Sequence, residues 1–438
     1  MIARFLDDGS IDAASGFGGT TGVVSGSGTI KAMSLSASGT SLFTAGGDLV
    51  RKHAASTGVL DNSFGTLGVV HSNSREADFS SSILRASGAG VSGSWSPNVD
   101  SRLGAQLDVS QGAWSGVLQV ISEQRLDHSY QPRIEWANIK YQMTPDLAVR
   151  VGRIALPVFL GAESRKVGYT IPWVRTPVEV YGALPISSSD GVDATWRWST
   201  GAVRHATQVF SGSTDQDLGY GLQIDANNIL GLSHSIDYGP LTVRLSAARA
   251  RLNTDIAADL FAGLRMFGPR GQMLAERYAI VDKRVSMISA GASYDPGAWF
   301  VTAETGRTRT DSLLGGGTSV YVGAGWRQGA FTPYVGYAQI RADVATSDPG
   351  LPLEGLPAPV AAGAAQINGA LNTLLATIPI QTTWSTGVRW DVASDLALKL
   401  QFEQVRPRGG SRGTLINSTP AFRSDRTVNV TSIALDFV

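Results

Sequence analysis

The sequence predicts an all-β fold: a transmembrane, antiparallel, up-and-down β-barrel of about sixteen strands. Three observations lead to this prediction. Charged residues make up only 16% of the 438-residue chain, against about 25% in typical soluble domains. The chain is nevertheless 43% hydrophobic and contains 51 glycines. Its apolar residues alternate with polar ones in many short segments, as in a barrel wall with lipid outside and water inside.

Two segments show this alternation most clearly. RLGAQLDVS (102–110) places Leu103 and the other apolar residues on one face and Asp108 on the opposite face. VDATWRW (192–198) places Trp196 on its apolar face in the same way. A period of two residues indicates strands whose two faces meet different surroundings.

No segment suits a transmembrane helix. The most apolar long stretch, 359–378, is interrupted by polar residues such as Gln366 and Asn372, whereas a spanning helix needs about 20 predominantly apolar residues. Residues 360–376 are instead expected to form a helix within a loop. Apolar residues at helical spacing predict a second short amphipathic helix within the connection 252–284.

The connections between the predicted strands alternate in length. Short turns, as at Gln111-Gly112 and Gly239-Pro240, alternate with long loops, as at 213–228, 252–284 and 343–379. Outer-membrane barrels have short periplasmic turns and long extracellular loops. Aromatic residues near the predicted strand ends would form the two interfacial girdles: Tyr141, Trp196, Trp198, Tyr238, Trp299, Trp326, Tyr334, Trp384 and Trp390.

The chain divides into a Gly/Ser-rich N-terminal extension (1–63) and the barrel (64–438). Within the extension, GSIDAASGFGGTTGVV (9–24) is echoed by GVLDNSFGTLGVV (58–70). These segments resemble the propeller-type repeat of the delta-sixty class. A single repeat lacks the neighbours against which such repeats bury their apolar faces. A flexible leader whose echo is chance is therefore the alternative interpretation.

A long irregular connection follows the fifth predicted strand. Residues 157–190 contain several prolines but are also rich in valine, isoleucine and aromatic residues. A long loop inside a compact fold is usually functional or disordered, and this composition favours packing. We expect the loop to fold into the barrel and narrow it, although its charges would also serve simply to fix it to the wall. The candidate constriction residues are Glu163, Arg165, Lys166, Arg175 and Glu179.

A second set of charged residues lies on the polar faces of the predicted strands. An arginine or lysine that faced lipid at mid-depth would cost about 2–4 kcal/mol, so these side chains are expected to face water inside the barrel. The predicted pore-lining wall residues are Asp108, Arg150, Asp193, Arg197, Arg244, Glu304, Arg389, Lys399 and Glu403.

Several functional classes are disfavoured. The formal net charge of zero argues against a nucleic-acid partner, which would call for a basic surplus. The absence of cysteine excludes disulfides and thiolate metal sites. The five histidines show no metal-ligand spacing, and no G-x-S-x-G nucleophile elbow is present. We therefore expect no enzyme, no cofactor and no metal site.

Four segments carry a family resemblance: FGTLGVVHS (64–72), NVDSRLGAQLD (98–108), VRVGR (149–153) and SIALDFV (432–438). Over about residues 64–438 the sequence resembles the general Gram-negative porin family, in particular its sixteen-stranded diffusion porins. The resemblance implies a water-filled channel in the cell outer membrane for passive diffusion of small hydrophilic solutes and ions. It also implies contact with outer-membrane lipid, an inward-folded third loop and a homotrimer.

The sequence departs from the family at both ends. Family members usually end on an aromatic residue, whereas here Phe437 is penultimate and Val438 is last. The stretch 1–15 has no charged-then-apolar signal sequence. The alternative is a soluble or surface-exposed β-repeat protein with a binding or structural role, which would stay monodisperse in water without detergent. The solute and the ion preference are left open, with a slight basic surplus that favours anions.

Overall fold

The computed structural model describes residues 63–182 and 186–438 with their side chains. Most of the echoed segment 9–24 and the beginning of 58–70 lie outside the described residues, so the propeller-type interpretation stays a prediction. In the extension, five short strands are described: β1 (Ile2–Ala3) pairs with β2 (Val23–Val24), and β3 (Ala32–Leu35), β4 (Ser41–Gly46) and β5 (Leu49–Ala54) form a three-stranded sheet.

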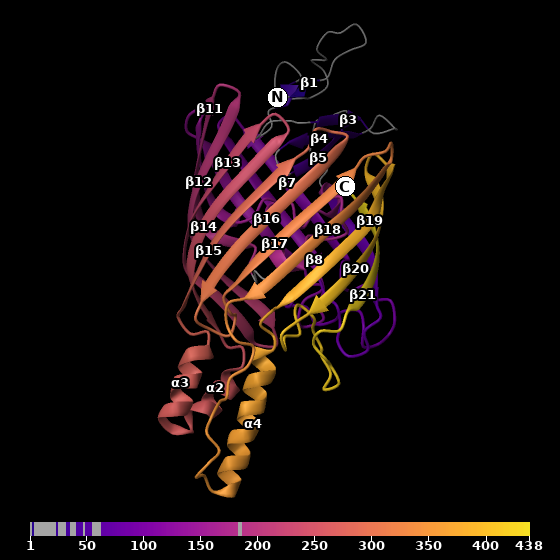
Figure 1. Cartoon of the computed structure of the whole chain (residues 1–438). Helices are drawn as coiled ribbons and strands as arrows, with labels where there is room; N and C mark the ends of the chain where they lie inside the picture. Colours follow the sequence, from indigo (N-terminus) through magenta and orange to yellow (C-terminus); the bar gives the residue numbers. More distant parts are fainter. Residues whose placement is uncertain are drawn as a thin grey trace.

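The residues described from Ser63 onward form a closed barrel of sixteen antiparallel strands, which confirms the predicted fold class (Figure 1). Each strand pairs with its neighbours in sequence, and β21 closes the barrel on β6. The strands are β6 (Ser63–Ser72), β7 (Arg102–Gln111), β8 (Trp114–Glu123), β9 (Arg133–Gln142), β10 (Leu147–Ala155), β11 (Ser188–Thr200), β12 (Val203–Gly219), β13 (Leu222–Tyr238), β14 (Leu241–Thr254), β15 (Lys283–Tyr294), β16 (Trp299–Thr310), β17 (Gly317–Trp326), β18 (Phe331–Ala342), β19 (Gln381–Ala393), β20 (Leu396–Pro407) and β21 (Val428–Phe437).

The two ends of the barrel differ in the length of their connections. One end, the turn end, carries the short turns, the C-terminus and the sheet β3–β5 (Figure 1). The other, the loop end, carries the long connections. The turns are 112–113, 143–146, 201–202, 239–240, 295–298, 327–330 and 394–395, and the loops are 73–101, 124–132, 156–187, 255–282, 311–316, 343–380 and 408–427.

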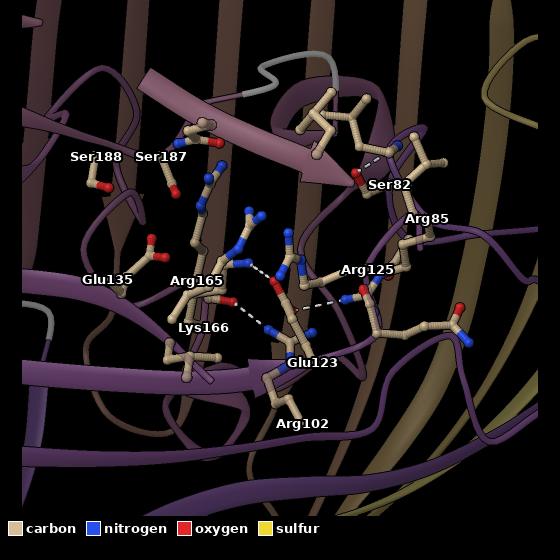
Figure 2. A pocket seen from close by; sticks show the side chains of 18 of the residues that line it. Ser82, Arg85, Arg102, Glu123, Arg125, Glu135, Arg165, Lys166, Ser187 and Ser188 are labelled. Atoms are coloured by element: carbon tan, nitrogen blue, oxygen red, sulfur yellow. Dashed lines mark hydrogen bonds and ion pairs between the residues drawn. The ribbon is translucent and has the colours of Figure 1, made fainter. Parts of the chain in front are cut away.

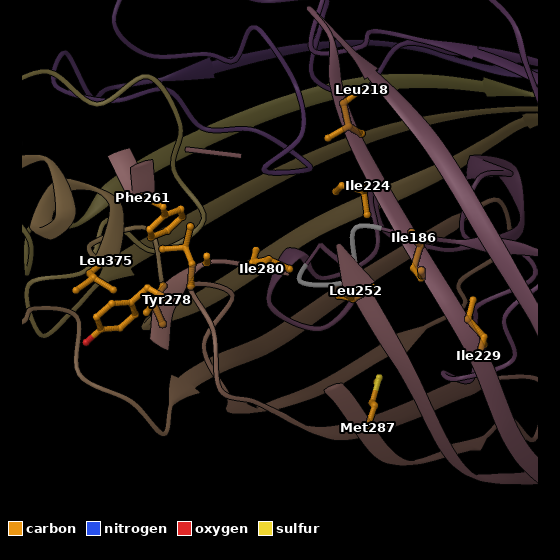
Figure 3. Close-up of a cluster of buried hydrophobic side chains, with 14 of the residues drawn as sticks. Ile186, Leu218, Ile224, Ile229, Leu252, Phe261, Tyr278, Ile280, Met287 and Leu375 are labelled. Atoms are coloured by element: carbon orange, nitrogen blue, oxygen red, sulfur yellow. The ribbon is translucent and has the colours of Figure 1, made fainter. Parts of the chain in front are cut away.

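The connection between β12 and β13 differs from the prediction. Both strands are 17 residues long and join through the two-residue turn 220–221, so 213–228 is a hairpin and not a loop. The strand ladder continues past three bulges, and Leu218 and Ile224 pack into an apolar cluster (Figure 3). A strand needs only about 9–11 residues to cross a membrane, so this hairpin extends beyond the membrane-spanning part of the barrel.

The outer face of the barrel is apolar. Leu107, Val151, Ile288 and Val335 are all exposed by more than half, and each alternates with an inward-facing neighbour. At the turn end, exposed aromatic side chains form a girdle, as expected for a membrane interface. They include Trp114, Tyr141, Trp196, Tyr238, Trp299, Trp326, Phe331 and Trp390.

Tyr334 does not belong to this girdle. Its side chain is 3% exposed and donates a hydrogen bond to the inward-facing Gln401 at 2.8 Å. It lies between Pro333 and Val335, both of which are exposed, so its position in the strand turns it inward. The girdle prediction was wrong for this residue because it considered height along the strand and not parity.

Three helices project from the loop end (Figure 1). They are α2 (Ala258–Arg265), α3 (Gly268–Tyr278) and α4 (Ala358–Leu375), and the helices expected in the two connections are therefore present. No helix within the described residues is long and apolar enough to cross a membrane. The helices pack through buried side chains that belong to the cluster of Figure 3, including Phe261, Leu264, Leu274, Leu371 and Leu375.

A buried hydrogen bond links the helices to their loop. Tyr278 donates to Asp348 at 2.6 Å, and burial together with this carboxylate raises the pKa of Tyr278 to about 12. Burial would raise the pKa of Asp348 as well, but Tyr278, the Gly350 N–H and Arg277 together hold that pKa below its usual value. The pair therefore connects α3 to the segment that precedes α4.

We expect a charge on the outer face of the wall to destabilise the barrel. Val335 is 57% exposed and lies in the middle of β18. Val335→Arg should lower the free energy of unfolding by about 2–4 kcal/mol, measured by denaturant titration of protein folded in vesicles. Val335→Leu is the control and should change it by less than about 0.5 kcal/mol. Equal stability of the two variants would contradict a lipid-facing position.

Candidate functional site inside the barrel

The segment 156–187, between β10 and β11, packs against inward-facing side chains of the wall. It contains the short helices η2 (Gly168–Thr170) and α1 (Val178–Tyr181). Val158, Phe159, Val167, Val174 and Val180 are each at most 6% exposed. An apolar, proline-rich segment can be buried in this way because polar partners form hydrogen bonds with its backbone N–H and C=O groups.

Lys399 of β20 holds the middle of the segment. Its Nζ donates to the carbonyl oxygens of Gly168 at 2.8 Å, Ile171 at 2.7 Å and Trp173 at 3.0 Å, and it forms an ion pair with Asp436 at 2.6 Å. Both charged side chains are fully buried. A Cβ on Gly168 would lie 2.2 Å from Asp436 Oδ1, so only glycine permits this close approach.

Arg175 holds the segment through two carboxylates. Its Nη2 lies 2.6 Å from Asp100 Oδ2, and its Nη1 donates to Glu403. The Arg175 side chain is 3% exposed. Burial alone would lower the pKa of Arg175, but Asp100 and Glu403 raise it above its usual value. The guanidinium therefore joins the loop 73–101, β20 and the segment in one buried cluster.

Aromatic packing adds a third contact in the middle of the segment. The Trp173 ring lies against Phe300, Tyr321 and Tyr334, with ring centroids 5.8, 5.4 and 5.8 Å away. The three rings come from β16, β17 and β18. Edge-to-face packing of this kind adds about 0.5–1.5 kcal/mol per pair beyond the buried area.

Four other predicted residues also connect the wall to the segment. Glu304 accepts from the Leu160 N–H at 2.8 Å and from Tyr181 Oη at 2.5 Å. Arg244 donates to the Phe159 and Leu160 carbonyls and lies 3.6 Å from Glu163. Arg389 donates to the carbonyls of Tyr169 and Ile171. Glu179, 2% exposed, accepts from Gln381 and Thr383.

Four predicted wall residues lie apart from these contacts. Arg150 and Asp193 form an ion pair across β10 and β11 at 2.7 Å. Asp108 accepts from Gln106 at 2.7 Å, and Arg197 is exposed on β11. The structure therefore brings five of the predicted wall residues together at the segment: Arg244, Glu304, Arg389, Lys399 and Glu403.

A cavity of about 500 Å³ lies beside the segment, bounded by β8 to β12 and the loops 73–101 and 124–132 (Figure 2). Eight basic side chains line it against four acidic ones. The basic residues are Arg85, Arg102, Arg125, Arg133, Arg153, Arg165, Lys166 and Arg175, and the acidic ones are Glu123, Glu135, Asp215 and Asp217.

Figure 2 shows the basic side chains converging around Glu123. Arg85 Nη2 lies 2.8 Å from Glu123 Oε2, and Lys166 bonds the other carboxylate oxygen. Arg102 Nη1 donates to the Arg165 carbonyl at 3.2 Å. Burial lowers the pKa of Lys166, while Glu123 and Glu135 counteract that shift. The Glu123 carboxylate is therefore shared by two cations, Arg85 and Lys166.

Sequence reasoning singled out Arg165, Lys166 and Arg175 among the residues that line the cavity, and missed the others. Arg85 and Arg125 lie in connections, where strand parity gives no direction. Arg102 and Arg133 are the first residues of β7 and β9. The sequence feature that could have predicted this cavity is the recurrence of arginine at the starts of strands and in the loops that precede those strands.

Comparison with known proteins identifies the fold. No protein-family model matches the sequence, and no curated protein matches it significantly. The anion-selective porin from Comamonas acidovorans superposes with a TM-score of 0.51 at 13% identity, over 86% of this chain and 98% of that one. The fold is that of an outer-membrane porin. OmpF of Salmonella typhi, in complex with daunomycin, matches with a TM-score of 0.51 at 11% identity, over 87% of this chain and 98% of that one.

The buried cluster around Arg175 predicts a large stability effect. Arg175→Met would leave the buried Asp100 and Glu403 without their cation, which should cost about 3–5 kcal/mol. The measurement is the free energy of unfolding in detergent, together with protease cleavage of the segment 156–187. Arg426→Met is the control, because the exposed Arg426–Glu76 pair should contribute at most about 1 kcal/mol. Equal losses in the two variants would contradict the anchoring role.

Proposed function

We propose that the protein is an outer-membrane porin, a passive channel for small hydrophilic solutes and ions, with no catalytic role. The observation that supports this best is the closed sixteen-stranded barrel whose outer face is apolar and whose inner face carries charge. An apolar outer wall of this kind needs lipid around it. The soluble β-repeat alternative would instead require a polar outer face.

Within this proposal, the segment 156–187 narrows the channel. Its contacts with β14, β16, β19 and β20 fill one side of the interior. The cavity on the other side, lined by loop-end residues, is the entrance that the segment leaves open. The short turns then face the periplasm, and the helices α2, α3 and α4 face the outside. A homotrimer, as the family resemblance implies, completes the proposal.

Conductance in planar bilayers tests the channel and its narrowing. The intact protein should give stable stepwise currents, and removal of residues 160–180 should raise the single-channel conductance severalfold, because the wall side chains beneath the segment would then line a wider opening. Removal of α4 at the loop end is the matched control and should leave the conductance close to that of the intact protein. Absence of any stepwise current would contradict the channel, and unchanged conductance after removal of 160–180 would contradict the narrowing.

Arg175 is neutralised by Asp100 and Glu403, and Arg153 pairs with Asp190. The other cavity-lining residues are six basic against four acidic ones, and this excess supports a preference for anions. A low-dielectric wall concentrates such a field at the opening, and salt screens it, since the Debye length falls from about 10 Å at 0.1 M to about 3 Å at 1 M. The reversal potential in a potassium chloride gradient should therefore favour chloride, and more strongly at low salt.

Neutral variants in the cavity should remove this preference. We expect Arg102→Gln, Arg133→Gln and Lys166→Gln, combined in one protein, to shift the reversal potential toward zero selectivity. Arg327→Gln is the control, since Arg327 pairs with Asp295 beyond the turn end of β17 and should leave the potential unchanged. A wild-type protein that prefers potassium would overturn the assignment.

A further inference from the structure

The cavity of Figure 2 lies against the open edge of a strand. The ladder between β11 and β12 ends at Ser213, although β12 continues to Gly219. Within the described residues, 214–219 therefore pair with β13 alone. All five residues from Thr214 to Leu218 line the cavity. Neighbouring residues of a strand point to opposite faces, so five in a row can border one cavity only where it meets the strand edge.

The backbone of this edge can take a ligand. The Asp217 carbonyl points out of the ladder, because it accepts from Arg125 Nη2 at 3.1 Å and from Arg133 Nη2. Asp215, two residues earlier, points its backbone groups the same way. An open strand edge is a template for pairing with another chain. An extended peptide can therefore add to it through its own N–H and C=O groups.

The cavity also holds a carboxylate that bonds to no cation of the protein. Glu135 is the extra residue of a β-bulge on β9, since Gln119 pairs with Trp136 and the next residue, Val120, pairs with Ile134. Bulges re-aim side chains, and Glu135 lines the cavity (Figure 2). Within the described part of the chain, Glu135 forms no hydrogen bond and no ion pair.

Three cations of the same cavity are free to meet a second charge. Among the described residues, Arg102, Arg133 and Arg165 form no ion pair, and their side chains bond only to backbone carbonyls. Guanidinium nitrogens that remain can hold a carboxylate in bidentate geometry. The cavity therefore offers an anion, several cations and a strand edge to one ligand.

We propose that the cavity binds short peptides in an extended conformation. The terminal ammonium meets Glu135, the terminal carboxylate meets the arginines without ion pairs, and the backbone lies along the edge of β12. The volume of about 500 Å³ is typical of small-ligand pockets. A simple anion would leave Glu135 and the edge unused, and a free amino acid would leave the edge unused. The inference rests on the proposed function, for which it names a solute class.

Calorimetric titration of the full chain in detergent with trialanine tests the site. Glu135→Gln removes the charge with little change in shape. Glu354→Gln is the matched control, since Glu354 is exposed before α4 and does not line the cavity. Four further probes divide the recognition. N-acetyl-trialanine lacks the ammonium, trialanine amide lacks the carboxylate, trialanine with methylated amide nitrogens lacks backbone donors, and alanine lacks the peptide backbone.

We expect Glu135→Gln to weaken trialanine binding at least about tenfold, as for the loss of a charged hydrogen bond, and Glu354→Gln to leave it unchanged. N-acetyl-trialanine should bind equally to the wild type and Glu135→Gln, because it has no charge for Glu135 to meet. The wild type should bind the amide, the methylated peptide and alanine severalfold more weakly than trialanine. Equal trialanine binding by the wild type and Glu135→Gln would overturn the proposal, and so would equal binding of alanine and trialanine by the wild type.

Planar-bilayer currents separate this outcome from the proposed function. Trialanine added on the loop-end side should interrupt the wild-type current in proportion to its concentration, and N-acetyl-trialanine should do so more weakly. A wild type that conducts but does not bind trialanine would overturn the peptide site and leave the channel standing. A wild type that binds trialanine without conducting would contradict the channel and support the site.

Discussion

The buried charges of Lys399, Asp436 and Arg175 are the interaction on which the interior of this barrel depends. Lys399 and Asp436 point inward from the wall, and Arg175 lies on the segment 156–187. Water would hydrate each of these side chains if the segment were separated from the wall. Covering them removes that water, which costs several kcal/mol per ion unless partners replace it. Lys399 regains four oxygen partners and Arg175 gains two carboxylates. The wall and the segment therefore satisfy one another.

This anchoring makes the interior asymmetric. The segment is fixed to β14, β16 and β19 to β21, where its backbone carbonyls and N–H groups meet Lys399, Arg389, Arg244 and Glu304. On the facing wall the segment bonds to Glu123 of β8 through Lys166, and the cavity lies open beside this contact, with Arg102, Arg133 and Arg153 among its lining residues (Figure 2). The same residue types therefore anchor a segment on one side and shape an electrostatic field on the other.

Period-two alternation predicted the strands well, because each crosses a wall with lipid on one face and a polar interior on the other. It could not predict what covers an inward side chain, so Lys399 and Asp193 looked equivalent in the sequence although only Lys399 holds the segment. The hairpin at 213–228 was missed because its bulges break the period. The arginines at 85 and 125 were missed because loops have no period, and only the folded chain brings them beside Lys166.

Strand β14 shows how closely the two faces are coupled. Arg244 points inward to the segment, while Arg249 and Arg251 point outward, because each lies an odd number of residues from Arg244. A slip of one residue in the pairing would carry Leu245 into the polar interior and Arg244 into hydrocarbon. Each face therefore fixes the register that the other requires. The cost of burying charge inside and the cost of exposing it to lipid act together, and they specify one alignment of the wall.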